Sequence, residues 1–74
     1  MGATHQARQA RIHILAETLK RKKALPVDEV YKFAVNRWLI SLRVINDYIR
    51  ELTATGKYKI QTRPDGDWLV YLGE

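Results

Sequence analysis

Residues 37–63, RWLISLRVINDYIRELTATGKYKIQTR, decide the fold of this 74-residue chain. From Ser41 onwards, apolar residues recur at steps of three and four, which places their side chains on one face of a helix. This apolar stripe consists of Leu42, Ile45, Ile49 and Leu52. The Ser41 hydroxyl can cap the start of such a helix, and Gly56 can end it in the left-handed backbone conformation. The stretch therefore predicts an amphipathic helix over about 41–55, followed by an extended segment.

The opposite face of this helix is polar and carries Arg43, Asn46, Asp47 and Arg50. Arginine offers two parallel donors that match guanine, and asparagine offers a donor and an acceptor that match adenine. Asp47 can accept a hydrogen bond from cytosine, or it can pair with Arg43 or Arg50 and hold them in place. We therefore expect the helix to present side chains that are able to read base edges.

The net charge of +5, with a pI near 9.8, favours a polyanionic partner, although many small proteins are basic for solubility alone. Residues 1–23 hold six Lys/Arg and one acid, whereas residues 24–74 balance seven against seven. Within that balanced part, residues 37–63 carry six basic residues and only two acids. Within residues 24–74, positive charge is thus concentrated on the predicted helix and the segment after it.

A length of 74 residues predicts one small domain that comprises residues 1–74. It has no cysteine, so neither a disulfide nor a thiolate metal site can stabilise it. No apolar run approaches the roughly 20 residues of a membrane span, and the first residues lack the continuous apolar region of a signal peptide. We expect a soluble cytoplasmic or nucleoid-associated protein without a cofactor.

Two further helices precede the 41–55 helix. Residues 5–22 carry an apolar stripe and end in the basic run 20–23, and Pro26 then breaks the chain at 24–27. A second helix follows, capped by Asp28 or a neighbour and ending near Arg37. The predicted core consists of Ile45, Ile49 and Leu52 together with Leu15, Leu19, Phe33 and Trp38.

Beyond Gly56 the sequence predicts a two-stranded β-hairpin. Polar and apolar residues alternate over 58–63, Pro64-Asp65-Gly66 provides a turn, and DWLVYLG (67–73) returns as a second arm. Because an isolated hairpin is marginal in water, we expect one face of it, including Trp68, Leu69 or Val70, to pack on the helices.

This order of elements, and above all ISLRVINDYIRELTATGKY (40–58), resembles the winged helix-turn-helix family. The resemblance implies an α+β fold in which a three-helix core is followed by a C-terminal two-stranded wing. It also implies that the helix over about 41–55 enters the major groove of double-stranded DNA, while the wing over about 58–71 follows the backbone or minor groove. The residues expected to contact DNA are Arg37, Ser41, Arg43, Asn46, Asp47, Arg50, Lys57, Lys59, Gln61 and Arg63. A sequence-specific transcriptional regulator is the function that this resemblance favours.

Winged-helix domains also serve as protein-protein modules of transcription or replication complexes, so the fold alone does not fix the function. We prefer the DNA-binding hypothesis because Arg, Lys, Asn and Gln are concentrated on the two elements that would meet a duplex. The assembly module remains the alternative.

Other chemistry finds little support in the sequence. Ser41 is the only serine and has no histidine near it in the sequence, so we expect no enzyme. His5 and His13 lie about 12 Å apart along a helix, too far to share a metal ion. Asp65 and Asp67 flank a turn glycine, where such residues are common. No small-molecule site is evident.

A second stripe on the first helix consists of small or apolar residues: Ala3, Ala7, Ala10 and Ile14. Such a stripe permits close helix approach in a homodimer through the N-terminal helix, which would suit a palindromic DNA site. It is equally consistent with a helix face that simply meets solvent.

Overall fold

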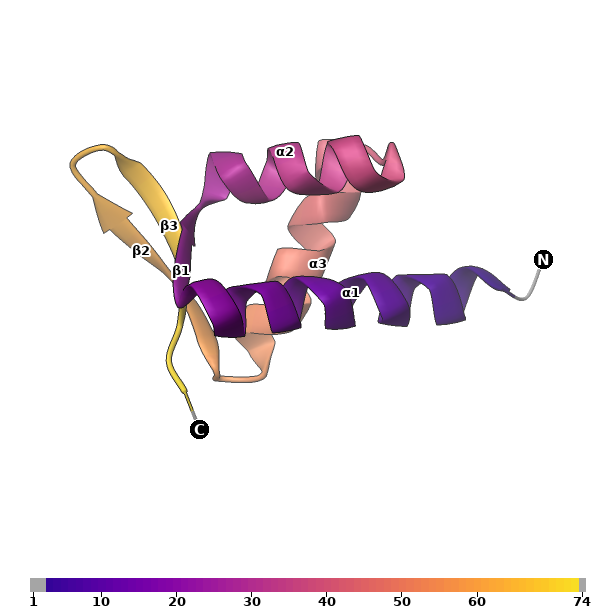
Figure 1. Ribbon diagram of the computed structural model, residues 1–74, viewed down its shortest axis with the longest axis horizontal. Coiled ribbons are helices and arrows are strands. Elements are labelled where there is room, and N and C mark those ends of the chain that lie inside the picture. The colour runs from indigo at the N-terminus through magenta and orange to yellow at the C-terminus, as the bar shows by residue number, and fades with distance from the viewer. Residues whose placement is uncertain (1–2, 74) are drawn as a thin grey trace.

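The computed structural model describes residues 3–73, and it describes side chains from residue 6 onwards. Within these residues the chain forms a small α+β domain with three helices and one three-stranded antiparallel sheet (Figure 1). The elements are α1 (Ala3–Lys22), β1 (Ala24–Pro26), α2 (Val27–Trp38), α3 (Leu42–Ala54), β2 (Tyr58–Arg63) and β3 (Gly66–Tyr71). No helix in this described part is long and apolar enough to cross a membrane.

The sheet contains one strand more than the sequence predicted. The segment 24–26, expected to be only an extended break, pairs antiparallel with β3, so the strand order is β1-β3-β2. Leu25 lies opposite Leu69, and Pro26 lies opposite Trp68 at the end of this edge strand. An edge strand tolerates proline because its outer side has no partner strand, so an N–H that is missing on that side removes no hydrogen bond of the sheet. The predicted two-stranded hairpin is present as β2 and β3, and β1 extends it to a three-stranded sheet.

The hydrophobic core lies between the three helices and one face of the sheet. It consists of ten buried residues: Leu15, Leu19, Val30, Ala34, Ile45, Tyr48, Ile49, Leu52, Tyr58 and Leu69. Five of the seven predicted core residues are among them. The other two, Phe33 and Trp38, are half-buried and stack edge to face with ring centroids 5.7 Å apart.

The apolar stripe of α3 is shifted by comparison with the prediction. Leu42 is 53% exposed, whereas Tyr48 is only 2% exposed. The Tyr48 ring packs edge to face on Trp38, and its hydroxyl lies 3.4 Å from the Arg11 guanidinium of α1, which donates to it. Since an amphipathic tyrosine can bury its ring and keep a partner for its hydroxyl, Tyr48 belongs to the core although the predicted stripe did not include it.

The predicted ends of α3 are confirmed, whereas the predicted cap of α2 is wrong. The Ser41 hydroxyl accepts a hydrogen bond from the Val44 backbone N–H at 3.4 Å, and Gly56 has φ +82°. At α2 the N-cap residue is Pro26 and no side chain caps the helix. Asp28 lies inside the first turn together with Glu29, where their negative charges favour the positive end of the helix dipole.

Helix α2 ends at an unusual residue. Leu39 adopts the left-handed conformation with φ 53° and ψ 45°, and its backbone N–H donates to the Val35 carbonyl. Its side chain is 87% exposed, so packing does not offset the steric conflict of a β-carbon in this conformation. A large apolar residue therefore occupies a position where glycine or asparagine would be more stable.

We expect Leu39→Gly to raise the free energy of unfolding by about 1 kcal/mol, because glycine enters the left-handed region without a steric penalty. Chemical denaturation followed by circular dichroism measures this gain. Leu39→Ala is the matched control, since it removes the exposed side chain and keeps the β-carbon. Equal stabilities of the Gly and Ala variants would show that Leu39 is not strained.

The alternation of side chains in the hairpin sets which residues face the helices. Tyr58, Leu69 and Tyr71 point inward, and the Tyr58 hydroxyl donates to the Ala16 carbonyl of α1 at 3.1 Å. Burial, with smaller contributions from Tyr71 and Glu17, raises the pKa of the Tyr58 hydroxyl. Of the three residues expected to pack on the helices, only Leu69 is fully buried, because Trp68 and Val70 alternate with it and belong to the opposite face.

Candidate nucleic-acid interface

The exposed face of α3 carries the four polar residues that the sequence placed there. Arg43, Asn46, Asp47 and Arg50 are all exposed, while Ile45, Tyr48, Ile49 and Leu52 are buried on the other side. We call these four exposed residues the α3 ridge. Its backbone is held by the Ser41 cap at one end and by core packing along its length, so the ridge is presented by a rigid element.

Asn46 is anchored by a residue of α2. The Tyr31 hydroxyl donates a hydrogen bond to Asn46 Oδ1 at 2.6 Å. The Tyr31 ring is half-buried against the core, whereas Asn46 is exposed. The carboxamide of Asn46 is therefore fixed by a side chain that does not itself lie on the ridge.

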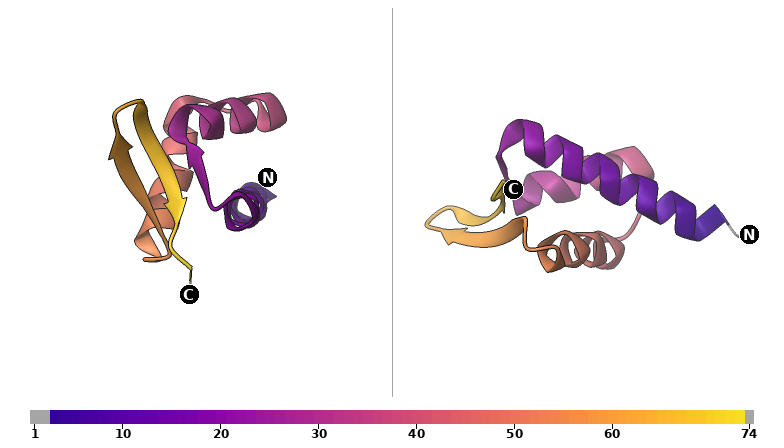
Figure 2. Two further views of the ribbon diagram at one scale, coloured as in Figure 1. Left: turned by 60° about the vertical axis from the view of Figure 1, so that its left-hand side comes forward. Right: turned by 90° about the horizontal axis from the view of Figure 1, so that it is seen from below.

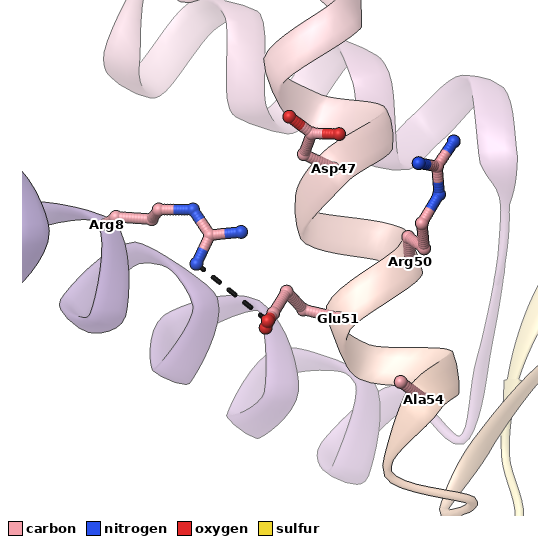
Figure 3. A pocket seen from close by; sticks show the side chains of 5 residues that line it. All are labelled: Arg8, Asp47, Arg50, Glu51 and Ala54. Atoms are coloured by element: carbon pink, nitrogen blue, oxygen red, sulfur yellow. Dashed lines mark ion pairs between the residues drawn. The ribbon is translucent and has the colours of Figure 1, made fainter.

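Asp47 pairs with neither of the arginines suggested by the sequence. Among residues 6–73 no ion pair joins Asp47 to Arg43 or Arg50. Together with Arg8 of α1, Glu51 and Ala54, Asp47 and Arg50 line a shallow pocket between α1 and α3 (Figure 3). Its carboxylate is thus free to accept hydrogen bonds.

Arg8 is the basic residue that α1 adds beside the ridge. Its guanidinium lies 3.9 Å from a carboxylate oxygen of Glu51 and 5.8 Å from the centre of the Tyr48 ring. In Figure 3, Arg8 points toward Glu51, while Arg50 extends away from α1. Both members of the Arg8–Glu51 pair are substantially exposed, so water and salt screen their attraction. Arg50 has no such partner in the described part of the chain and keeps all its donors available.

The wing residues form an ordered cluster on the outer face of the hairpin. Lys59, Gln61 and Arg63 alternate with the inward residues of β2, and Gln61 lies opposite Trp68. The Arg63 guanidinium lies 4.4 Å from the centre of the Trp68 ring, and its Nε donates to Gln61 Oε1 at 2.7 Å. Trp68 Nε1 in turn donates to the Asp65 carboxylate at 3.2 Å. These contacts hold Arg63 flat against Trp68 and leave its terminal N–H groups available.

Helix α3 and the hairpin lie along one side of the molecule. In the right-hand view of Figure 2 they follow one another along the edge away from α1. The inner face of the hairpin is buried at Tyr58 and Leu69, whereas Ile60 further out is 41% exposed and lines a groove with Asn46 and Arg50. The hairpin thus meets the α3 ridge through Ile60 and Asp67 of its inner face, whereas Lys59, Gln61 and Arg63 lie on its outer face.

Three of the predicted contact residues lie outside the α3 ridge and the outer face of the hairpin. Arg37 is on α2, with its guanidinium 5.7 Å from the centre of the Phe33 ring. Lys57 lines a groove with Glu17 and Lys20 of α1. Ser41 is exposed but uses its hydroxyl as the α3 cap. The structure thus places seven of the ten predicted residues in two groups: Arg43, Asn46, Asp47 and Arg50 on the exposed face of α3, and Lys59, Gln61 and Arg63 on the outer face of the hairpin.

Two residues were missed by the sequence analysis: Tyr31, which contacts the ridge at Asn46, and Arg8, which contacts Glu51 beside the ridge. The sequence analysis assigned no functional role to Tyr31, and it counted Arg8 only as part of the basic N-terminal segment. Their partners, Asn46 and Glu51, are 15 and 43 residues away along the chain. No local pattern could have revealed these pairings.

The dimer and metal expectations are only partly covered by the described side chains. On the second stripe of α1, Ala10 is exposed and Ala7 and Ile14 are half-buried, while the side chain of Ala3 lies outside the described residues. The side chain of His5 also lies outside the described residues. Within the described residues no group of three His, Cys, Asp or Glu side chains could hold a metal ion. Homodimer formation and the lack of enzymatic activity both remain predictions.

No protein-family model matches this sequence, no curated protein is significantly similar to it, and no solved structure gives a significant match to the fold. Any functional assignment therefore rests on the residues and geometry of this chain.

Proposed function

We propose that this chain is a winged helix-turn-helix domain that binds double-stranded DNA as a sequence-specific transcriptional regulator. In this proposal α3 enters the major groove, and the hairpin of β2 and β3 is the wing that follows the backbone or minor groove. The protein uses no cofactor.

The layout of the elements supports the first part of this proposal. Helix α1, the short strand β1, helices α2 and α3 and the hairpin follow in the order expected for this family, and β1 completes the sheet beside β3. Only three residues separate α2 from α3, so the two helices meet at a tight turn.

The observation that carries the DNA proposal is the exposed polar α3 ridge on a helix that contacts a hairpin with basic residues on its outer face. An α-helix fits the major groove of B-DNA, and arginine and asparagine are the side chains that most often read purines there. Lys59 and Arg63 add positive charge beside the helix, where a duplex continues along its backbone. Phosphate contacts of this kind position the protein, and base contacts give it specificity.

Salt titration of duplex binding tests the proposal. We expect the logarithm of the association constant to fall linearly with the logarithm of salt concentration, because each phosphate contact releases counterions. Lys59→Ala should make the slope shallower by about 0.9, the contribution of one phosphate contact. Fluorescence anisotropy with a labelled duplex measures both quantities.

Lys20→Ala is the matched control for this titration. Lys20 carries the same charge, but it pairs with Glu17 on α1 at 3.8 Å, away from the α3 ridge. We expect its slope to equal that of the wild type. Binding that does not respond to salt, or an equal change of slope in the two variants, would contradict the proposed surface.

One observation favours the assembly module as a second candidate. Leu39 and Leu42, at and just after the turn between α2 and α3, are 87% and 53% exposed. Exposed large apolar side chains that lie close together are typical of protein-binding surfaces. If the protein does not bind duplex DNA and a protein partner is captured through this turn, the assembly module takes the place of the DNA proposal.

A further inference from the structure

Asn46 is the residue of the α3 ridge whose side-chain oxygen already accepts a hydrogen bond from another part of the protein. Its Oδ1 accepts from the Tyr31 hydroxyl at 2.6 Å, which is short for an O–H···O hydrogen bond. Its Nδ2 group donates to no protein atom in the described part of the chain. The side chain therefore presents two unused donors, and its acceptor is turned toward α2.

Tyr31 is well placed to impose this orientation. Its ring packs against the core, and with Asn46, Ile49 and Arg50 it lines a groove between α2, α3 and the hairpin. A ring that is held by packing cannot follow the motions of an exposed carboxamide, so the hydrogen bond restrains Asn46. The rotation that would exchange its oxygen and nitrogen breaks this bond.

We propose that Tyr31 is a positioning residue that makes Asn46 a donor toward DNA and so sets the base that Asn46 prefers. This inference rests on the proposed function. Bidentate recognition of adenine requires the Asn oxygen and nitrogen together, because adenine presents N7 as an acceptor and N6 as a donor. With Oδ1 held by Tyr31, the Nδ2 group meets the base alone.

The expected preference follows from the major-groove edges of the four bases. Guanine presents two acceptors, O6 and N7, and thymine presents the O4 acceptor. Adenine presents the N7 acceptor beside its N6 amino donor, and cytosine presents only its N4 amino donor. The position of the DNA site opposite Asn46 should therefore favour guanine, which offers two acceptors, over adenine and thymine, which offer one each, and over cytosine, which offers none.

Selection of bound sequences from a random duplex pool, carried out with the full chain, tests this proposal. The wild type should enrich guanine at one position that becomes unselective in Asn46→Ala. Tyr31→Phe keeps the ring and removes the hydroxyl, so it should let adenine enter at that position. We expect its preference for guanine over adenine to fall by about threefold to tenfold, the range associated with ordering one side chain.

A double variant separates positioning from a general loss of structure. If Tyr31 acts through Asn46, adding Tyr31→Phe to Asn46→Ala should change neither affinity nor base preference further. Preferences at the positions read by Arg43 and Arg50 should stay as in the wild type. A Tyr31→Phe variant that weakens binding at every position alike would overturn the proposal, because a structural role alone would do this.

Nuclear magnetic relaxation of the Asn46 side-chain amide in the free wild-type protein provides a test that needs no variant. We expect this amide to be as rigid as the backbone of α3. A freely moving amide would overturn the proposal even if Tyr31→Phe failed to fold. Wild-type protein that binds no duplex would overturn the proposed function and this inference together, whereas an unchanged base preference in folded Tyr31→Phe would overturn this inference alone.

Discussion

Leu52→Ala is expected to lower the free energy of unfolding by about 2–5 kcal/mol, the usual cost of emptying a buried leucine site. Leu52 is 3% exposed and belongs to the core between α3, the other helices and the sheet. Domains of this size have a total stability of about 4–11 kcal/mol, so the substitution removes a large share of it. Urea denaturation followed by circular dichroism measures the loss.

The same substitution at Leu42 is the matched control. Both residues lie on α3 and both belong to the apolar stripe predicted from the sequence, but Leu42 is 53% exposed. We expect Leu42→Ala to cost less than about 1 kcal/mol, because little apolar surface is lost from the interior. Equal losses in the two variants would mean that the first turn of α3 is buried after all.

The features that the sequence predicted correctly are those with local causes. The Ser41 cap and the Gly56 stop each depend on a few neighbouring residues, and they set the ends of α3 to within one residue of the expected range. The alternation of side chains over 58–63 likewise predicted β2, because the two faces of a strand follow from its geometry. In these cases the local preference and the tertiary structure agree.

The features that the sequence did not reveal depend on contacts between distant segments. Strand β1 has only three residues and exists because Leu25 and its neighbours pair with β3, more than 40 residues further along the chain. Tyr48 becomes a core residue because Trp38 and Arg11 surround it. The inward side of the hairpin could not be chosen in advance, since both sides contain aromatic or aliphatic residues.

The candidate site shows the same division. The exposed ridge of α3 follows from helix periodicity and was predicted in full. Its supporting contacts, from Tyr31 to Asn46 and from Arg8 to Glu51, join different helices. The separation of Arg37 and Lys57 from the ridge also depends on tertiary structure. The positions of basic residues in the sequence could not reveal it.

Arg50→Ala should weaken binding to the preferred DNA site by about 1–3 kcal/mol if Arg50 reads a base in the major groove. Arg50 is exposed, forms no ion pair in the described part of the chain and points away from α1 (Figure 3). Its effect on random duplex should be much smaller, since base contacts contribute little to non-specific binding. Alanine is a good helix former, so the melting temperature should hardly change.

Lys59→Ala is the comparison that separates base reading from phosphate contact. Lys59 lies on the outer face of the wing, so its loss should weaken preferred and random duplexes by a similar factor. The ratio of the two affinities, measured at one salt concentration, should therefore fall in Arg50→Ala and stay constant in Lys59→Ala. If Arg50→Ala and Arg43→Ala both keep the wild-type affinity and ratio while remaining folded, α3 is not the reading helix. The polar face of α3 would then be better explained as a surface that meets protein, as in the assembly-module alternative.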